Sequence, residues 1–235
     1  MPEHLTRKEL LKTDHFTETV EHAADYFGMH RRQAVQLGAG IVIAAIAAVG
    51  IYLWLDHASS VRAEKLSAAM QIATAQVGAS GSPAAVVYLT QDQKDAAETK
   101  AYTELASEYG SSKEGAIAEY SLAGMAAANG RNDEARKRYT QVAGSGNKDY
   151  ASLANLALAQ LDYAEGKTAD SEKILRDLMA HPTAVVSKEQ ATLTLVHQIA
   201  KTRPAEARSL LDPMLSEPGE VGQMAVAAKA EIPGK

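Results

Sequence analysis

The sequence contains no cysteine, so disulfide bonds, thiolate catalysis and cysteine-ligated metal sites are all excluded. This absence leaves the compartment open, since a chain without thiols suits an oxidising periplasm as well as a cytosol. Aromatic residues are also scarce, at 5% of 235 residues, whereas alanine is abundant. Because small side chains let helices pack closely, this bias favours an all-α protein.

Basic residues are outnumbered, with 24 Lys and Arg against 29 Asp and Glu, which gives a net charge of −5. A phosphate backbone is bound by basic surface, so this balance argues against a nucleic-acid partner. Catalytic motifs are missing too: no Gly-rich phosphate loop precedes a helix, and there is no His-Glu-x-x-His or Gly-x-Ser-x-Gly. His181 and His197 stand alone in the sequence. We therefore predict a binding or scaffolding role, with no enzyme activity, cofactor or metal.

One long apolar run is present, at residues 34–55, where Gln36 is the only strongly polar side chain. As a helix it would span roughly 33 Å, against about 30 Å for the hydrocarbon core of a bilayer. A buried core helix is an alternative, but soluble helices rarely run this long without a charge. A cleaved signal peptide is another, but the leader is too long and no small-x-small cleavage site follows Leu55. The run therefore predicts an uncleaved signal anchor, a single transmembrane helix.

The charges that flank this run suggest its orientation. Residues 30–32, His-Arg-Arg, abut its start and Asp56 abuts its end, which favours a cytoplasmic N-terminus. Arg62 and Lys65 lie near the far end, so the bias comes from proximity and not from count. Trp54 stands where an outer interface belt would form. We expect residues 1–33 in the cytoplasm, residues 34–55 in the membrane and residues 56–235 outside.

Small residues recur within the predicted span, where Gly40, Ala44 and Ala48 lie four apart on one helix face. Such stripes permit close approach of two helices in a bilayer. In a segment so rich in alanine the same pattern also arises by chance. The stripe is thus a candidate transmembrane helix contact, with both readings open.

The N-terminal tail has an apolar face of its own between about Asp14 and His30, with apolar residues at three-to-four spacing. One reading is an amphipathic helix that lies on the bilayer or on a partner. The other reading is a solvated tail. The sequence does not choose between them.

The remainder of the chain contains a repeat. Ala-Asn-Gly-Arg begins at 128, Ala-Glu-Gly-Lys at 164 and Ala-Lys-Thr-Arg at 200, so the offset is 36 residues both times. A fixed period of this size predicts stacked helical hairpins, each with a helix A, a tight turn and a helix B. One hairpin cannot bury its own apolar face, so stacking stabilises the domain. The expected helices are one that continues the span to about Val77, then about 92–109, 113–129, 132–143, 148–165, 168–180, 187–201, 204–216 and 219–231; residues 84–89 could be extended or helical.

The repeat resembles the tetratricopeptide repeat in several columns. It departs from that family in its period, 36 and not 34, in the missing tryptophan of helix A, and in Ser171, which replaces a helix-B alanine. The resemblance implies an α-solenoid of antiparallel helix pairs, built from degenerate repeats. The matching residues are the Leu122-Ala123 and Leu158-Ala159 pairs of helix A, the turn glycines Gly130 and Gly166, and Ala135, Ala207 and Tyr139 of helix B.

The whole layout, a short tail that ends near Tyr26-Phe27, one span and then degenerate repeats, resembles the bacterial YfgM-like family. That resemblance implies an inner-membrane protein with a periplasmic repeat domain. It also implies an ancillary partner of the SecYEG translocon, which works with periplasmic chaperones such as a PpiD-type foldase on exported polypeptides. A structural scaffold for envelope assembly or cell division, without client binding, is the alternative.

Tetratricopeptide stacks usually present a concave face built from the A helices. Here that face would be largely apolar and would lack the Lys, Asn and Arg set that clamps a C-terminal carboxylate in some family members. An apolar groove suits non-native segments or an amphipathic partner helix. The alternative is that these side chains are covered by the helix before Val77 or by the terminal helix. The candidate groove residues are Ile117, Tyr120, Leu153, Leu156, Gln160, Tyr163, Thr192, Val196 and Ile199.

Overall fold

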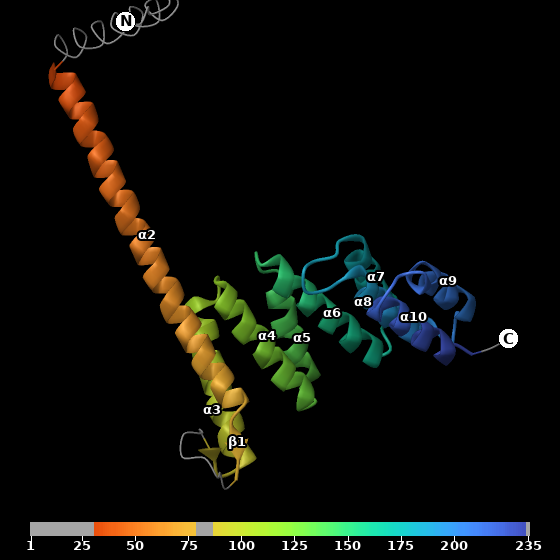
Figure 1. The fold of residues 1–235 in the computed structure, drawn as a ribbon. Helices are drawn as coiled ribbons and strands as arrows, with labels where there is room; N and C mark the ends of the chain where they lie inside the picture. The colour runs from red at the N-terminus through yellow and green to blue at the C-terminus, as the bar shows by residue number, and fades with distance from the viewer. Residues whose placement is uncertain (1–30, 79–86, 234–235) are drawn as a thin grey trace, which may run out of the picture. The chain divides into compact units, whose positions relative to one another are not determined.

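A computed structural model of the chain describes residues 31–78 and 87–233 (Figure 1). These residues form nine α-helices and one pair of two-residue strands, which confirms the predicted all-α fold. Each predicted helix from residue 92 onward is present, with ends within two residues of those expected. The helices are α2 (Arg31–Ala73), α3 (Gln91–Tyr109), α4 (Lys113–Ala128), α5 (Asn132–Ala143), α6 (Lys148–Ala164), α7 (Thr168–Ala180), α8 (Lys188–Ile199), α9 (Pro204–Leu215) and α10 (Glu220–Glu231).

Helix α2 ends earlier than the sequence suggests. We expected it to reach about Val77, but it stops at Ala73, and β1 (Gln76–Val77) follows. That prediction is wrong because β1 pairs in parallel with β2 (Val87–Tyr88), which draws the chain out of the helix. The strand β2 falls in the stretch 84–89 that the sequence left open; its residues 84–86 lie outside those described.

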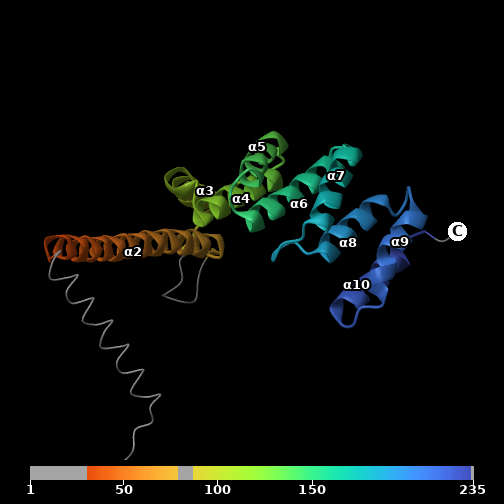
Figure 2. The ribbon, with the colours of Figure 1, turned by 90° about the horizontal axis from the view of Figure 1, so that it is seen from above.

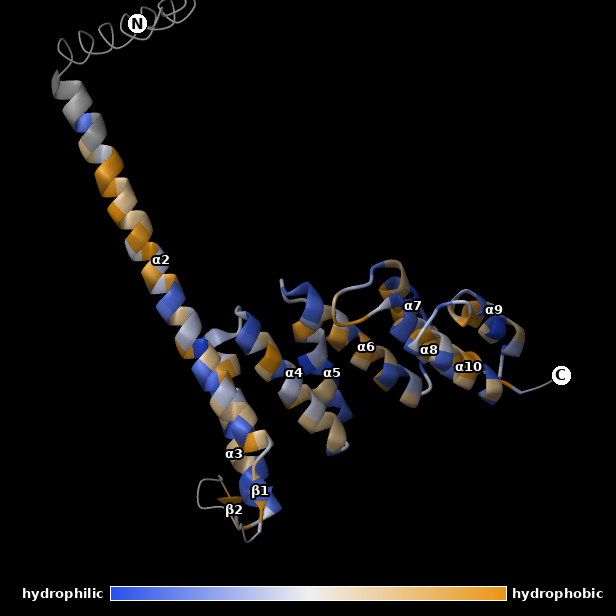
Figure 3. Cartoon of the chain, viewed as in Figure 1, coloured by the Kyte–Doolittle hydropathy of each residue, from blue (hydrophilic) through white to orange (hydrophobic). Residues whose placement is uncertain are grey.

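Two compact units meet within α2, the first ending at Ser60 and the second beginning at Val61. In the first unit the described part of α2 from Ala39 to His57 is exposed throughout, and Figure 3 shows its apolar run in orange. Among the described residues, α2 is the one helix long and apolar enough to cross a membrane. The predicted tail helix, about 14–30, lies outside the described residues.

In the second unit each helix from α3 onward packs against the next along the chain (Figure 2). The hairpins are α4 with α5, α6 with α7, and α8 with α9. We call α4, α6, α8 and α10 the A helices, because α6 also lies against α4 and α10 against α8. The B helices are then α5, α7 and α9. This arrangement is the expected solenoid of antiparallel pairs.

The turns between the helices of each hairpin explain the repeated tetrapeptides. Gly130 and Gly166 have φ values of +71° and +79°, a left-handed conformation that glycine adopts without strain. The third turn carries Thr202 instead of glycine, and no described non-glycine residue has a positive φ. There the backbone N–H of Arg203 donates to the carbonyl oxygen of Ile199 at 2.7 Å. The third repeat thus turns by another geometry, which removes the need for glycine.

The A helices α4, α6 and α8 begin with a side-chain cap, whereas α10 and the B helices begin without one. A capping oxygen satisfies one of the backbone N–H groups that a helix start leaves unpaired. These caps fix where α4, α6 and α8 start after their loops. The caps are Ser112, Asn147 and Ser187, which accept from the backbone N–H groups of Gly115, Tyr150 and Gln190 at 3.1, 3.2 and 3.1 Å.

The core lies in the layers between helices, as the repeat predicts. On each B helix a small residue is followed by larger apolar residues four and seven positions later, and all are buried. Fully burying a large apolar side chain stabilises a fold by about 1.5–3 kcal/mol, so these columns dominate the packing. The members of the pattern are Ala135, Tyr139 and Val142 on α5, Ser171, Leu175 and Leu178 on α7, and Ala207, Leu211 and Met214 on α9.

Candidate protein-binding surface

Some of the residues predicted to line a concave groove are accessible to solvent in the structure, and others are buried. The structure places them all on A helices, α4, α6 and α8, as expected. Only those at the α4 and α6 end of the stack remain accessible. Ile117, Tyr120 and Leu153 are half-buried, Gln160 and Tyr163 are exposed, and Leu156, Thr192, Val196 and Ile199 are buried.

The four buried residues cannot line an open groove, so their assignment is corrected. Val196 and Ile199 belong to the same apolar cluster as Ala225 and Ala228, because α10 covers this side of α8. Leu156 joins that cluster, which also contains Val186 from the loop between α7 and α8. The groove is therefore closed by the terminal helix and by this loop over its C-terminal half.

The N-terminal half keeps a hollow of about 450 Å³. Its apolar floor combines Leu66 and Met70 of α2 with Ile117 of α4 and Tyr150 of α6. The side chain of Met70 is 52% exposed, so a large apolar side chain of the hollow is accessible to a partner. Every lining residue comes from α2 and the residue just after it, α4 or α6, so the hollow lies on the A-helix face where tetratricopeptide stacks usually bind.

Ionic contacts hold the end of α2 beside this hollow. Arg62 donates to Glu114 of α4 at 3.2 Å, and both side chains are partly buried. Lys65 pairs with Glu108 of α3 and stands 5.2 Å from the ring centre of Tyr109. The hydrogen bond from Lys65 holds the pKa of Glu108 below its ordinary value. These contacts position the α2 wall of the hollow.

Two of the hollow's apolar residues, Leu66 and Met70, were missed from the sequence, as was Tyr150. The sequence predicts the helix after Asp56 as a continuation of the span and gives it no binding role. A signal was available, because Leu66, Ala69 and Met70 recur at the three-to-four spacing of an amphipathic helix. Ala69 is fully buried against α3 and α4, so the same stripe serves both the core and the surface.

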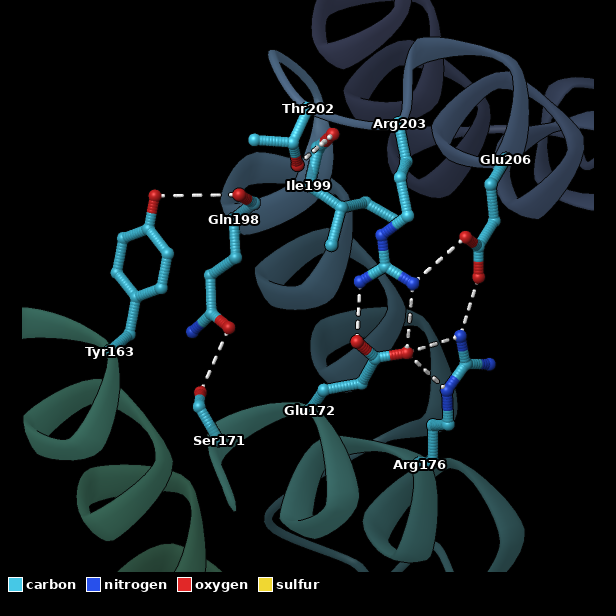
Figure 4. A network of polar contacts seen from close by, with 9 residues as sticks. All are labelled: Tyr163, Ser171, Glu172, Arg176, Gln198, Ile199, Thr202, Arg203 and Glu206. Carbon is cyan, nitrogen blue, oxygen red and sulfur yellow. Dashed lines mark hydrogen bonds and ion pairs between the residues drawn. The ribbon is translucent and has the colours of Figure 1, made fainter. Parts of the chain in front are cut away.

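At the other end of the predicted groove, Tyr163 belongs to a set of polar contacts that joins α6, α7 and α8 (Figure 4). Its hydroxyl donates to the backbone carbonyl of Gln198 at 3.4 Å. The hydroxyl of Ser171 donates to the carbonyl oxygen of Ala159 at 2.6 Å and lies 2.8 Å from Oε1 of Gln198. The serine that departs from the family pattern is therefore fully buried yet hydrogen-bonded between α6, α7 and α8.

The same view shows an ion-pair network between α7 and α9 (Figure 4). Glu172 of α7 accepts from Arg203, at the start of α9, and from Arg176, one turn along α7. Glu206 of α9 completes the network by pairing with both arginines. The hydrogen bonds from Arg203 and Arg176 lower the pKa of Glu172 to about 2. Ion pairs between these side chains therefore connect α7 to α9, two successive B helices.

The small residues of the candidate transmembrane contact, Gly40, Ala44 and Ala48, are exposed along α2. A Cβ added at Gly40 would meet no atom within 4 Å. The contact with another helix stays a prediction.

Over residues 31–78 and 87–233, no group of three His, Asp or Glu side chains could hold a metal ion.

A family model described as a tetratricopeptide repeat-like domain matches residues 30–209. The match takes in α2 and ends within α9, so α10 lies beyond it. No curated protein and no solved structure matches the chain.

Proposed function

This chain belongs to the tetratricopeptide repeat-like domain family, and from that premise we propose that it is a membrane-anchored module for binding other proteins. Tetratricopeptide-like folds are typically non-catalytic interaction scaffolds. The observation that carries the proposal is the hollow of about 450 Å³ on the A-helix face, in whose lining the Met70 side chain is half exposed.

The anchor is the apolar run of α2. Residues 34–55 span a bacterial inner membrane, residues 1–33 lie in the cytoplasm and residues 56–235 in the periplasm. The exposure of the described part of this run, from Ala39 to Leu55, supports the assignment, because a soluble protein rarely leaves so large an apolar surface uncovered. A reporter that is active only outside the cytoplasm, fused after Lys235, would be active; an inactive reporter contradicts the orientation.

The hollow suits an apolar or amphipathic segment of another chain. Leu66, Met70 and Ile117 give it an apolar floor, while Lys113 and Glu114 give it a charged rim. Methionine is unbranched and polarisable, so it adapts to partners of different shape. A surface of this kind fits exported polypeptides that still expose apolar residues.

The resemblance of the layout to the YfgM-like family motivates the identity of the partners. On this proposal the chain is an ancillary subunit of the SecYEG translocon, and it assists a PpiD-type foldase with polypeptides as they leave the membrane. Part of the hollow's lining, residues 63–74, follows the anchor closely in sequence, and this order supports client binding near the site of export.

The proposal is tested by co-purification after gentle detergent extraction. We expect the full chain to retain translocon subunits or a periplasmic foldase, and Met70→Glu to reduce the retained amount because it puts a charge on the apolar floor. Val185→Glu is the matched control, since Val185 is 42% exposed and lies outside the hollow. If neither partner is retained, under conditions that keep known translocon subunits together, the proposal is contradicted. If Met70→Glu and Val185→Glu reduce the retained amount equally, the role of the hollow is contradicted.

A further inference from the structure

The connection between α7 and α8, residues 181–187, is longer than the other connections between successive hairpins, residues 110–112, 144–147 and 216–219 (Figure 1). We call residues 182–186 of this connection the strap. Within the strap Val186 is fully buried, whereas Ala184 and Val185 are exposed. The strap therefore turns one large apolar side chain inward and leaves its neighbours in solvent.

The strap lies against the groove side of α6. The side-chain oxygen of Thr183 is 2.7 Å from that of Ser152, which is buried. Ser152 and Leu156 are four residues apart on α6, so they share a helix face. Leu156 is also buried, and it belongs to the same apolar cluster as Val186. The strap thus covers a part of the A-helix face that the sequence predicts as open groove.

The period of 36 residues shows how the strap arises. Thr183 corresponds to Asn147, the cap of α6, and its side-chain oxygen accepts from the backbone N–H of Val186 at 3.2 Å, a contact of the kind that a cap makes. Helix α8 nevertheless begins only after a second cap, Ser187, and has 12 residues against 17 in α6. Val185 and Val186 are β-branched, which lowers their preference for a helix. The strap is therefore a first helical turn that has left its helix.

Few contacts hold the strap closed. The backbone N–H of Thr183 donates to the carbonyl oxygen of Val186 at 2.9 Å, so the turn is bonded largely to itself. Among the described residues, the contact between the hydroxyls of Thr183 and Ser152 is the one hydrogen bond found between the strap and α6. A segment with few buried apolar contacts opens locally at a lower free energy than the whole domain unfolds. The strap can therefore open while the helices stay packed.

An open strap would extend the hollow beside α2 along α6. Ile117 and Tyr150 line that hollow. Leu153, the counterpart of Ile117 one repeat later, is half-buried, and Ser152 and Leu156 beside it are buried. With the strap open, an apolar surface would run over two successive A helices.

We propose that the strap regulates the client site: it occupies part of the A-helix face in the unbound chain, and an apolar segment of a bound polypeptide displaces it. This inference rests on the proposed function, since the client is the one expected at the hollow. Val186 takes the place of an apolar side chain of the client. The apparent affinity for a client falls with the fraction of chains in which the strap is open, so short apolar segments that cannot reach past the hollow bind weakly.

The first test measures opening in the absence of any client, with the full chain in detergent micelles. Because the chain has no native cysteine, Val186→Cys and Val142→Cys each carry a single thiol at a buried valine. We expect a thiol reagent to label Val186→Cys about tenfold faster or more, since Val142 lies in the core and becomes accessible only on wider unfolding. Equal rates, or slower labelling of Val186→Cys, overturn the proposal.

The second test locks the strap. The hydroxyls of Ser152 and Thr183 are close enough for a disulfide to replace their contact in the double variant Ser152→Cys with Thr183→Cys. The probe is a fluorescent peptide of serine and glutamine with leucine at every third or fourth position, and its anisotropy is compared with that in empty micelles. We expect the oxidised double variant to bind about tenfold more weakly than the reduced form, and reduction to restore binding. Each single variant should bind equally under both conditions.

The outcomes separate this proposal from the proposed function. If the parent chain binds no peptide, the client site and its regulation are both overturned. If the parent binds, and the oxidised and reduced double variants bind equally well, the regulation alone is overturned.

The third test holds the strap open. Val186→Glu places a carboxylate where a buried side chain lies, so the closed strap is disfavoured. We expect its affinity for the peptide to rise by about threefold or more, because more chains are open. Val185→Glu is the matched control: Val185 is the next residue in the strap and is already exposed, so its affinity should equal that of the parent. An unchanged or lower affinity in Val186→Glu, with the urea unfolding transition of the repeats retained, overturns the proposal.

Discussion

Between Ile41 and Leu55 the large apolar side chains of α2 are 53% to 69% exposed, whereas Leu175, Leu195 and Leu211 of the repeats are fully buried. The residue types are similar, so composition does not explain the difference. In the repeats, apolar residues alternate with polar ones at helical spacing, and each helix has one side to bury and another to expose. The run in α2 is apolar all round, so no packing on one side could cover it. The run is long and apolar enough to cross a membrane, where lipid would surround all of its sides.

The strongest way to break this comparison is to place charge in the apolar run. Ile43→Asp combined with Ile46→Asp should abolish stable membrane insertion, because each central aspartate costs about 2.5–3.5 kcal/mol on insertion scales. The measurement is the fraction of chain that resists extraction from membranes at alkaline pH. The control is Ala96→Asp with Thr99→Asp, two exposed positions on α3, which should leave that fraction unchanged.

A cavity in the repeat core should be the next largest effect. Leu195→Ala removes a fully buried side chain, and we expect a loss of about 2–5 kcal/mol in the free energy of unfolding. Urea unfolding followed by circular dichroism, with the chain in micelles, provides the measurement. Leu53→Ala, in the exposed run, should leave the same transition within about 0.5 kcal/mol. Equal losses would mean that α2 unfolds together with the repeats.

The glycines of the two regions give a third contrast. A Cβ at Gly115 would lie 2.0 Å from the carbonyl oxygen of Tyr109, whereas a Cβ at Gly50 would meet nothing within 4 Å. Gly115→Ala should destabilise the repeats by about 1–3 kcal/mol or more through overpacking. Gly50→Ala should leave the unfolding transition where it is. A tolerated Gly115→Ala would show that α3 and α4 can separate without cost.

Buried hydroxyls distinguish one repeat from another. Ser171→Ala removes a satisfied hydrogen bond and should cost about 0.5–1.5 kcal/mol, even though alanine is the family residue there. Ala207→Ser, at the matching position of the next repeat, buries a hydroxyl where the packing is built for a methyl group and should cost about 1–3 kcal/mol. The measurement is the urea concentration at the unfolding midpoint of each variant, compared with that of the parent chain. If Ser171→Ala raised this midpoint, the hydrogen bonds of Ser171 would contribute little to stability.

The smallest effect concerns pH. Because the pKa of Glu172 is lowered to about 2 in the folded chain, its ion pairs contribute stability above the ordinary carboxyl value of 4.5, and this contribution is lost as pH falls towards 2. Glu172→Gln should therefore narrow the difference in thermal midpoint between pH 6 and pH 3. The control is Asp133→Asn. The carboxylate of Asp133 is exposed, and no such ion pair is found for it among the described residues. An identical pH dependence in the parent and Glu172→Gln contradicts this role.

The helices and their order could be predicted because their signals are local. The repeated tetrapeptides and the capping residues act within one or two turns of the chain, and the period of 36 residues repeats them at each hairpin, so the observed bounds follow them closely. The end of α2 was mispredicted because β1 pairs with β2, a contact between segments apart in sequence. Of the predicted groove residues, Ile117 lines the hollow, whereas Val196 and Ile199 are covered by α10; binding at the hollow stays a proposal.

The sequence by itself determined that this chain has an apolar run suited to a membrane and a stack of paired helices, because hydrophobic periodicity and turn chemistry are written in neighbouring residues. Only the tertiary structure decided which apolar residues of the A helices remain accessible. Exposure depends on what a distant segment covers: α10 closes the face of α8, while α2 leaves the hollow beside Met70 open.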